Sequence, residues 1–205
     1  MVKDGIYYGL GFGLAALAVG LIFSPPWAVP LAILAAFCLY FFRDPHREIP
    51  DGPVAVSPAD GVIVHIRDTP DGGNRVSIFL NVFDVHINRS PIAGRIVEAE
   101  YNHGRFMMAH KADASEANER NALTIEPDDP NLSPLKVTQI AGLVARRIVC
   151  YKKVGDPVKK GERFGLIKFG SRTDLHLGPE WRLEVIKGQR VAGGSSIIAR
   201  LEAAK

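Results

Sequence analysis

The chain opens with a long stretch of uncharged, mostly apolar residues. No charged side chain occurs in residues 5–42, and prolines divide the stretch into two runs, residues 5–23 and 27–42. The first run is about long enough to cross the hydrocarbon core of a bilayer as a helix. The second is marginal, but tilting or local thinning of the bilayer accommodates a short span. The pattern predicts a hydrophobic helical hairpin in residues 1–42 that anchors the protein in a membrane.

The residues that flank this stretch predict its orientation. Basic groups stand on both sides, Lys3 before it and Arg43 and Arg47 after it. Because basic flanks favour the cytoplasmic side, we expect both ends of the hairpin, and the domain that follows, at the cytoplasmic face of the cell membrane. A cleaved signal peptide is an alternative that Asp4 and the second apolar run disfavour. A pair of buried core helices is another, and the combined uncharged length disfavours it.

After residue 50 the sequence pattern changes to short apolar runs separated by Gly, Pro, Asn and Asp. The runs are rich in Val and Ile and about five residues long, which is typical of strands. A short helix or ordered loop is expected at residues 113–119. Strands are expected at residues 54–56, 61–66, 75–80, 94–100, 122–126, 135–140, 148–151, 163–169, 173–177 and 197–201.

These elements predict a fold that is mainly β, a β-rich α+β domain over residues 43–205. Residues 153–162 contain turn-forming residues on both sides of a short exposed segment, as in the small β-sandwiches that carry biotin or lipoyl groups. Residues 189–198 show a weaker form of the same turn pattern. We therefore expect a single catalytic domain with the character of a flattened barrel or biotinyl-like sandwich.

Charge and cysteine content narrow the classes of partner. The formal net charge is only +3 and no basic stripe is interleaved with aromatics, so no nucleic-acid partner is expected. A slightly basic protein is compatible with an anionic membrane surface. The two cysteines, Cys38 and Cys150, have no neighbours at metal-ligand spacing. Neither a metal site nor a disulfide framework is predicted.

A Gly-Ser pair, Gly170-Ser171, stands at the end of a predicted strand. A serine hydroxyl in this place can attack the carbonyl of the preceding residue, and glycine lacks the Cβ that would block the approach. The dipeptide alone is more often an ordinary turn. A competing pair, Gly194-Ser195 followed by Ser196, lies too near the C-terminus for a following strand to build a site around it.

Two further phrases supply an acid and an imidazole. Asp60 lies in Ser-Pro-Ala-Asp-Gly-Val-Ile at residues 57–63, and His86 lies in Asn-Val-Phe-Asp-Val-His-Ile-Asn-Arg-Ser-Pro at residues 81–91. Together with Phe-Gly-Ser-Arg at residues 169–172, they resemble the short form of the phosphatidylserine decarboxylase family. The resemblance runs from about Phe42 to the C-terminus. It includes Arg-Asp-Pro-His-Arg at residues 43–47, Asn-Glu-Arg-Asn at 118–121 and the run at 139–147.

The resemblance implies a phospholipid-biosynthesis enzyme that cuts its own chain between Gly170 and Ser171. The large chain (residues 1–170) and the small chain (residues 171–205) would stay associated. Ser171 would become a pyruvoyl group, with no metal and no pyridoxal phosphate. That group would form a Schiff base with phosphatidylserine, and loss of CO2 would give phosphatidylethanolamine. An archaeal ether-lipid substrate, as in an archaetidylserine decarboxylase, stays open, as does a homodimer.

The resemblance also implies roles for the other two residues. His86 would be the base that activates Ser171 and later handles a proton. Asp60 would hold His86 in the useful tautomer. Asp84 is a rival for that role, because residues two apart on a strand share a face.

Two details of the sequence bear on these roles and on the class of function. His103 is a second, weaker histidine candidate, and Phe83 stands where long-form relatives often carry an additional histidine, so a role for that histidine does not transfer. A membrane-anchored biotinyl- or lipoyl-like carrier module is the alternative from another class. It needs a lysine at an exposed hairpin tip, whereas Lys159 and Lys160 lie in the turn before a strand.

Overall fold

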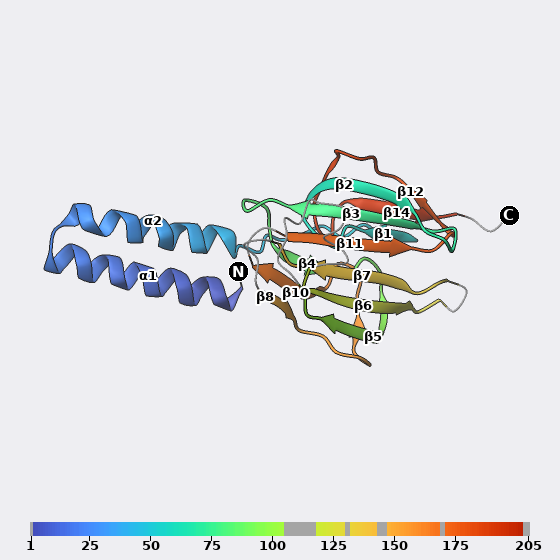
Figure 1. Cartoon of the computed structure of the whole chain (residues 1–205), viewed down its shortest axis with the longest axis horizontal. Coiled ribbons are helices and arrows are strands. Elements are labelled where there is room, and N and C mark those ends of the chain that lie inside the picture. The colour runs from blue at the N-terminus through green and yellow to red at the C-terminus, as the bar shows by residue number, and fades with distance from the viewer. Residues whose placement is uncertain (1, 105–117, 130–131, 143–146, 169–170, 203–205) are drawn as a thin grey trace. The chain divides into compact units, whose positions relative to one another are not determined.

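The computed structural model describes residues 2–104, 118–129, 132–142, 147–168 and 171–202. The chain divides into two compact units, Met1–His46 and Arg47–Lys205. The first contains two helices, α1 (Lys3–Ile22) and α2 (Pro25–Phe41), and the strands of the described residues lie in the second (Figure 1).

The two helices of the first unit form a closed hairpin. Only two residues separate α1 from α2, and prolines begin α2 at positions where a missing N–H costs no helical hydrogen bond. At the other end, the Val2 N–H donates to the Phe42 carbonyl at 3.1 Å. The rings of Tyr8 and Phe42 stack there with centroids 5.8 Å apart. The start of α1 therefore lies beside the end of α2, as the apolar pattern predicts.

Many apolar side chains of the hairpin are exposed. Leu14, Leu21 and Trp27 have 66%, 78% and 70% of their surface exposed. With 20 residues, α1 is long and apolar enough to cross a membrane, whereas α2, which is also apolar, has 17. This exposure argues against a pair of buried core helices, because core helices hide the apolar side chains that these helices present.

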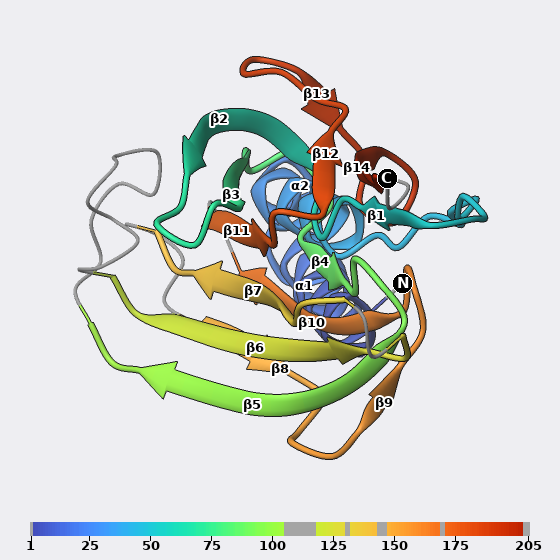
Figure 2. The ribbon, with the colours of Figure 1, turned by 90° about the vertical axis from the view of Figure 1, so that its right-hand side faces the viewer.

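The second unit consists of short antiparallel strands. They are β1 (Val54–Val56), β2 (Gly61–Asp68), β3 (Asn74–Leu80), β4 (Ile87–Arg89), β5 (Gly94–Asn102), β6 (Arg120–Pro127), β7 (Leu135–Ile140), β8 (Arg147–Cys150), β9 (Pro157–Val158), β10 (Arg163–Lys168), β11 (Ser171–Leu177), β12 (Trp181–Leu183), β13 (Arg190–Val191) and β14 (Ile197–Leu201). The largest sheet has the order β13-β2-β3-β11-β7-β6-β5-β9 and is curled (Figure 2). Two three-stranded sheets accompany it, β4-β10-β8 and β1-β14-β12.

The strand β11 lies inside the large sheet, between β3 and β7. It pairs with β3 along its whole length, from Ser171 opposite Leu80 to Leu177 opposite Asn74. Residues 172–176 pair with β7 on the other side. The strand that begins at Ser171 is therefore held by backbone hydrogen bonds on both edges.

The hydrophobic core lies on one face of this sheet. Val76, Ile78 and Leu80 of β3 and Leu175 and Leu177 of β11 are at most 2% exposed. Apart from Phe79, the residues that alternate with them along the two strands are polar and point to the other face, which is the period of two expected for a sheet with one apolar side.

The fold is mainly β, as the sequence predicts. Most of the expected strands are present within a residue or two of their expected bounds. The strands β4, β9, β12 and β13, of two or three residues each, were not expected, because none of them forms an unbroken apolar run such as the Val-Ala-Val of β1. Of the expected helix or ordered loop at 113–119, residues 113–117 lie outside the described residues.

Candidate active site

Ser171 is fully buried at the first position of β11. Its exposed fraction is 0%, and among the described residues its Oγ has no hydrogen-bond partner. A buried hydroxyl without a partner costs free energy, so a native structure that keeps one needs a reason. A reactive hydroxyl kept clear of other partners is such a reason. Gly170, the other half of the expected cleavage site, lies outside the described residues.

His86 is buried next to the strand that leads toward Ser171. It is 2% exposed, and its carbonyl accepts a hydrogen bond from the N–H of Ile167 in β10 at 3.2 Å. Its ring Nδ1 lies 2.9 Å from the main-chain carbonyl of Asp84. A carbonyl can only accept, so Nδ1 carries the proton and the neutral ring has its lone pair on Nε2. This tautomer is the one that a general base requires.

His86 immediately precedes β4, and Ser171 is the first residue of β11. The strand β3 ends at Leu80, opposite Ser171, and residues 81–85 lead from there to His86. Further along, Asn88 Nδ2 donates to Thr173 Oγ1 at 3.0 Å, which joins β4 directly to β11. His86 and Ser171 each precede this bond by two residues, on the same side of their strands. The action of His86 on Ser171 stays a prediction, which this arrangement of β4 and β11 favours.

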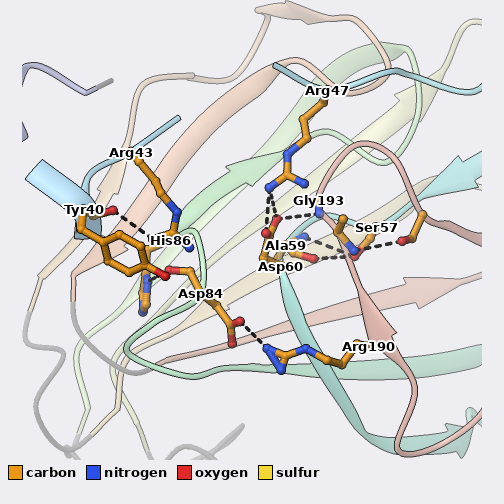
Figure 3. A network of polar contacts seen from close by, with 12 residues as sticks. Tyr40, Arg43, Arg47, Ser57, Ala59, Asp60, Asp84, His86, Arg190 and Gly193 are labelled. Carbon is orange, nitrogen blue, oxygen red and sulfur yellow. Dashed lines mark hydrogen bonds and ion pairs between the residues drawn. The ribbon is translucent and has the colours of Figure 1, made fainter. Parts of the chain in front are cut away.

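Asp60 follows β1 in a tight turn and is bound by an arginine and a backbone amide (Figure 3). Arg47 Nη2 lies 2.9 Å from Oδ1 and 2.7 Å from Oδ2, and the Gly193 N–H donates to Oδ1 at 2.8 Å. A Cβ at position 193 would stand only 3.2 Å from this oxygen, so glycine permits the approach. In the described part of the chain Asp60 thus pairs with Arg47 and Gly193 and not with His86. Its orienting role stays a prediction.

The carboxylate of Asp84 is also engaged elsewhere. Its Oδ2 accepts the Asn81 N–H at 2.8 Å, and its Oδ1 lies 2.7 Å from Arg190 Nη2 (Figure 3). It is the main-chain carbonyl of Asp84 that accepts a hydrogen bond from the His86 ring, at 2.9 Å. Asp84 therefore orients the imidazole through its backbone, a contact that side-chain spacing does not predict.

The sequence analysis did not predict the two arginines that hold these carboxylates. Arg47 lies in the Arg-Asp-Pro-His-Arg phrase that contributes to the family resemblance, and that phrase was the available signal. Arg190 carries no motif, and its side chain is 66% exposed. Its pairing with Asp84 spans 106 positions in the sequence.

The weaker candidates lie in different surroundings. Ser196 Oγ accepts the Ala192 N–H at 2.9 Å, so it stabilises the turn in which it stands, where Gly194 has a φ of 82°. His103 is exposed just after β5, with its ring edge-on to Tyr101 at 5.1 Å. Neither shows the burial of Ser171 and His86.

Comparison with known proteins identifies the family of the chain. The protein-family model described as Phosphatidylserine decarboxylase matches residues 34–199, a span that contains Asp60, His86 and Ser171. The chain belongs to the phosphatidylserine decarboxylase family. It is accordingly a decarboxylase, an enzyme of the lyase class.

Relatives of the decarboxylase match it over almost its whole length. A phosphatidylserine decarboxylase proenzyme of Solibacter usitatus is 55% identical over 98% of this chain and 96% of its own. A proenzyme of the same name from Ehrlichia chaffeensis is 44% identical, covering 98% of this chain and 91% of its own. Another from Syntrophus aciditrophicus is 40% identical, covering 96% and 95%. The apolar hairpin is therefore included in the aligned length.

A buried ion pair follows the serine of the decarboxylase. Arg172 and Asp174 are 0% and 1% exposed, and Arg172 Nε lies 2.9 Å from Asp174 Oδ1. Burial lowers the pKa of Arg172, and the neighbouring Asp174 acts in the opposite direction. Both point to the face of β11 opposite Ser171, because side chains alternate along a strand. Within the described residues, no group of three or more His, Cys, Asp or Glu side chains could hold a metal ion.

Proposed function

We propose that this decarboxylase is made as a proenzyme that cleaves itself between Gly170 and Ser171 and then decarboxylates phosphatidylserine. The observation that carries the proposal is the Ser171 hydroxyl, which is buried without a partner among the described residues at the end of the sheet where His86 lies. The names of the relatives support phosphatidylserine as substrate over the ether-lipid alternative.

Self-cleavage follows from the chemistry of the two side chains. His86 Nε2 takes the proton of the Ser171 hydroxyl, and Oγ attacks the Gly170 carbonyl carbon. The peptide C–N bond breaks, so Gly170 becomes an ester on Oγ and the Ser171 nitrogen becomes an amine. Loss of the Cα proton then expels Gly170 as a carboxylate and leaves dehydroalanine. Its tautomer takes up water and releases ammonia, which leaves a pyruvoyl group at the start of the small chain.

The position of Ser171 fits such a group. It is buried, its hydroxyl is kept clear of partners among the described residues, and the strand that follows is fixed on both edges. A pyruvoyl group supplies a carbonyl that condenses with the substrate amine and draws in the electrons left when CO2 departs. His86, oriented by the Asp84 carbonyl, is the chain's own group that can hold or deliver a proton beside this position.

The apolar hairpin is proposed to hold the enzyme at the bilayer that contains its substrate. The exposed apolar side chains of α1 and α2 would face lipid, and Lys3 and Arg43 at the two ends would lie on the cytoplasmic side. A phospholipid does not leave the membrane, so an anchored enzyme meets it without extraction.

Intact mass spectrometry tests the proposal. The wild-type chain is expected as two fragments, residues 1–170 and 171–205, with the small fragment lighter than a serine-initiated peptide by the mass of one ammonia. Ser171→Ala is expected as a single intact chain without decarboxylase activity on phosphatidylserine vesicles. Ser196→Ala is the matched control and should be processed normally. An intact and active wild-type chain would overturn the proposal.

A further inference from the structure

Four buried polar side chains form a continuous row of hydrogen bonds behind the candidate site. Asn121 Nδ2 donates to Gln139 Oε1 at 2.9 Å, Gln139 Nε2 donates to Asn88 Oδ1 at 2.9 Å, and Asn88 Nδ2 donates to Thr173 Oγ1 at 3.0 Å. Asn88, Gln139 and Thr173 are 0% exposed and Asn121 is 6% exposed. We call these four residues the amide row.

The amide row crosses from one sheet to another. Asn121, Gln139 and Thr173 stand on β6, β7 and β11 of the large sheet, and Asn88 stands on β4 of a three-stranded sheet. The bond between Asn88 and Thr173 is therefore a side-chain connection between sheets that share no backbone ladder with each other.

Gln139 also approaches β10, the strand that precedes the cleavage site. A Cβ at Gly165 would stand 2.9 Å from Gln139 Nε2, so the absence of a side chain there makes room for the amide. The same Nε2 lies 3.4 Å from the carbonyl of Val149 in β8. Through Gln139 the amide row thus contacts β8 and approaches β10, the strand before the Gly-Ser pair, and through Thr173 it includes the strand after the pair.

Packing alone does not account for polar groups in this place. Thr173 stands in β11 where Leu175 and Leu177 continue the apolar core on the same face. Buried amides lose their hydration, and apolar residues of similar shape often serve stability equally well. Hydrogen bonds are directional, however, and a row with its donors satisfied fixes how one strand lies along another.

We infer that Asn88, Gln139 and Thr173 are positioning residues that hold His86 against Ser171 for self-cleavage. Asn88 follows His86 by two residues, and Thr173 follows Ser171 by two. The hydrogen bond between Asn88 and Thr173 therefore fixes the position of the base relative to the nucleophile along the two segments. The inference rests on the proposed self-cleavage. It adds that the geometry of the reaction depends on side chains that touch neither reacting atom.

The test measures the self-cleavage rate of the full-length chain after synthesis in the presence of detergent micelles. Thr173→Val keeps the shape and removes the hydroxyl, and we expect it to slow cleavage about tenfold to a hundredfold, because small displacements of reacting groups have effects of this size. Thr173→Ser restores the hydroxyl and should cleave within about threefold of wild type. Thr138→Val, on the opposite face of the neighbouring strand β7, is the matched control and should cleave normally.

Two combinations separate positioning from a general effect on stability. Asn88→Ala removes the bond to Thr173 and also the bond from Gln139, so adding Thr173→Val to Asn88→Ala should cost little more than Asn88→Ala alone. In a His86→Ala background, Thr173→Val should add no further loss to the residual rate, because the row acts through His86. If the amide row only stabilised the fold, the losses in cleavage rate would add, and they would parallel the decrease in the melting temperature of each variant.

The outcomes distinguish this inference from the function on which it rests. Cleavage of Thr173→Val at the wild-type rate, or an additional loss in the His86→Ala background, overturns the positioning role and leaves the proposed function intact. A wild-type chain that stays uncleaved overturns the proposed function and this inference with it.

Discussion

Arg47 binds both carboxylate oxygens of Asp60 through a single nitrogen, at 2.9 and 2.7 Å. Arg47 is the first residue of the strand-rich unit, and both side chains are largely buried, with 14% and 17% exposed. The contact fixes the segment that enters this unit to the turn that carries a candidate catalytic acid.

We expect Arg47→Ala to lower the free energy of unfolding by about 1.5–3 kcal/mol, because it removes charge-assisted hydrogen bonds from a largely buried carboxylate. Chemical denaturation in micelles measures the effect. The control is Arg182→Ala, which removes a contact with Glu184 from an arginine that is 63% exposed. It should change stability by less than about 1 kcal/mol. Equal losses of unfolding free energy in the two variants would show that the Arg47–Asp60 pair stabilises the fold no more than an exposed ion pair does.

Self-cleavage should depend on His86 most of all. His86→Ala is expected to slow it about a hundredfold or more, since it removes the general base. Asp60→Asn should slow it less, and Asp84→Asn less again, because the Asp84 group that meets the ring is a main-chain carbonyl that the substitution keeps. Time courses of fragment appearance give the order. A larger effect of Asp84→Asn than of Asp60→Asn would transfer the orienting role to Asp84.

Activity should need no added cofactor or metal. Chelators are expected to leave the processed enzyme unchanged, whereas borohydride added with phosphatidylserine should trap a covalent adduct on the small fragment, because a pyruvoyl carbonyl condenses with the amine. Mass spectrometry of the two fragments locates the adduct. Loss of activity on chelation, restored by a metal ion, would argue for a different chemistry.

His176 should make stability depend on pH. Burial lowers its pKa, and although Asp174 opposes this shift, Arg75 and Lys136 add to it. As the pH falls below about 6.5, the unfolded chain takes up a proton before the folded protein does, so the free energy of unfolding decreases until the folded form is protonated too. Denaturation between about pH 7.5 and about pH 5 should show this decrease, and His176→Gln should reduce it. An unchanged slope in the variant would exclude His176 as a source.

Removing the hairpin should separate anchoring from processing. A chain that begins at Arg43 keeps Asp60, His86, Ser171 and the whole strand-rich unit, so we expect it to self-cleave. It should also leave the membrane fraction, because burial of about twenty apolar residues is what makes membrane attachment nearly irreversible. Fractionation after a salt and carbonate wash measures this. A truncated chain that stays with the membranes would show that the second unit has an insertion surface of its own.

The sequence predicted the parts of the protein that have a local pattern. The uncharged run of residues 5–42 indicated the hairpin, alternating Val and Ile indicated the longer strands, and three phrases indicated Ser171, His86 and Asp60. The short strand β4 was missed because Ile-Asn-Arg shows neither a period nor an apolar run, whereas the equally short β1 is Val-Ala-Val.

The sequence also did not predict which polar side chains pair between different sheets. Asn88 and Thr173 are 85 positions apart, and their contact depends on the register of two different sheets. The pairing of Asp60 with Arg47 was missed for a related reason, because a loop and a turn have no periodicity from which a contact could be inferred. Sequence patterns predicted where most of the strands lie but not which polar groups meet between them.

The place of β11 between β3 and β7 has a consequence for the life of the processed enzyme. A cut before Ser171 turns an inner strand of the sheet into the first segment of a separate polypeptide, while the backbone bonds on both of its edges remain. If the proposed self-cleavage follows folding, the chain folds as one molecule, but any later refolding would require two molecules to meet. Recovery after heating should then depend on protein concentration, as in an obligate heterodimer, and lifetime would be governed by the rate of unfolding.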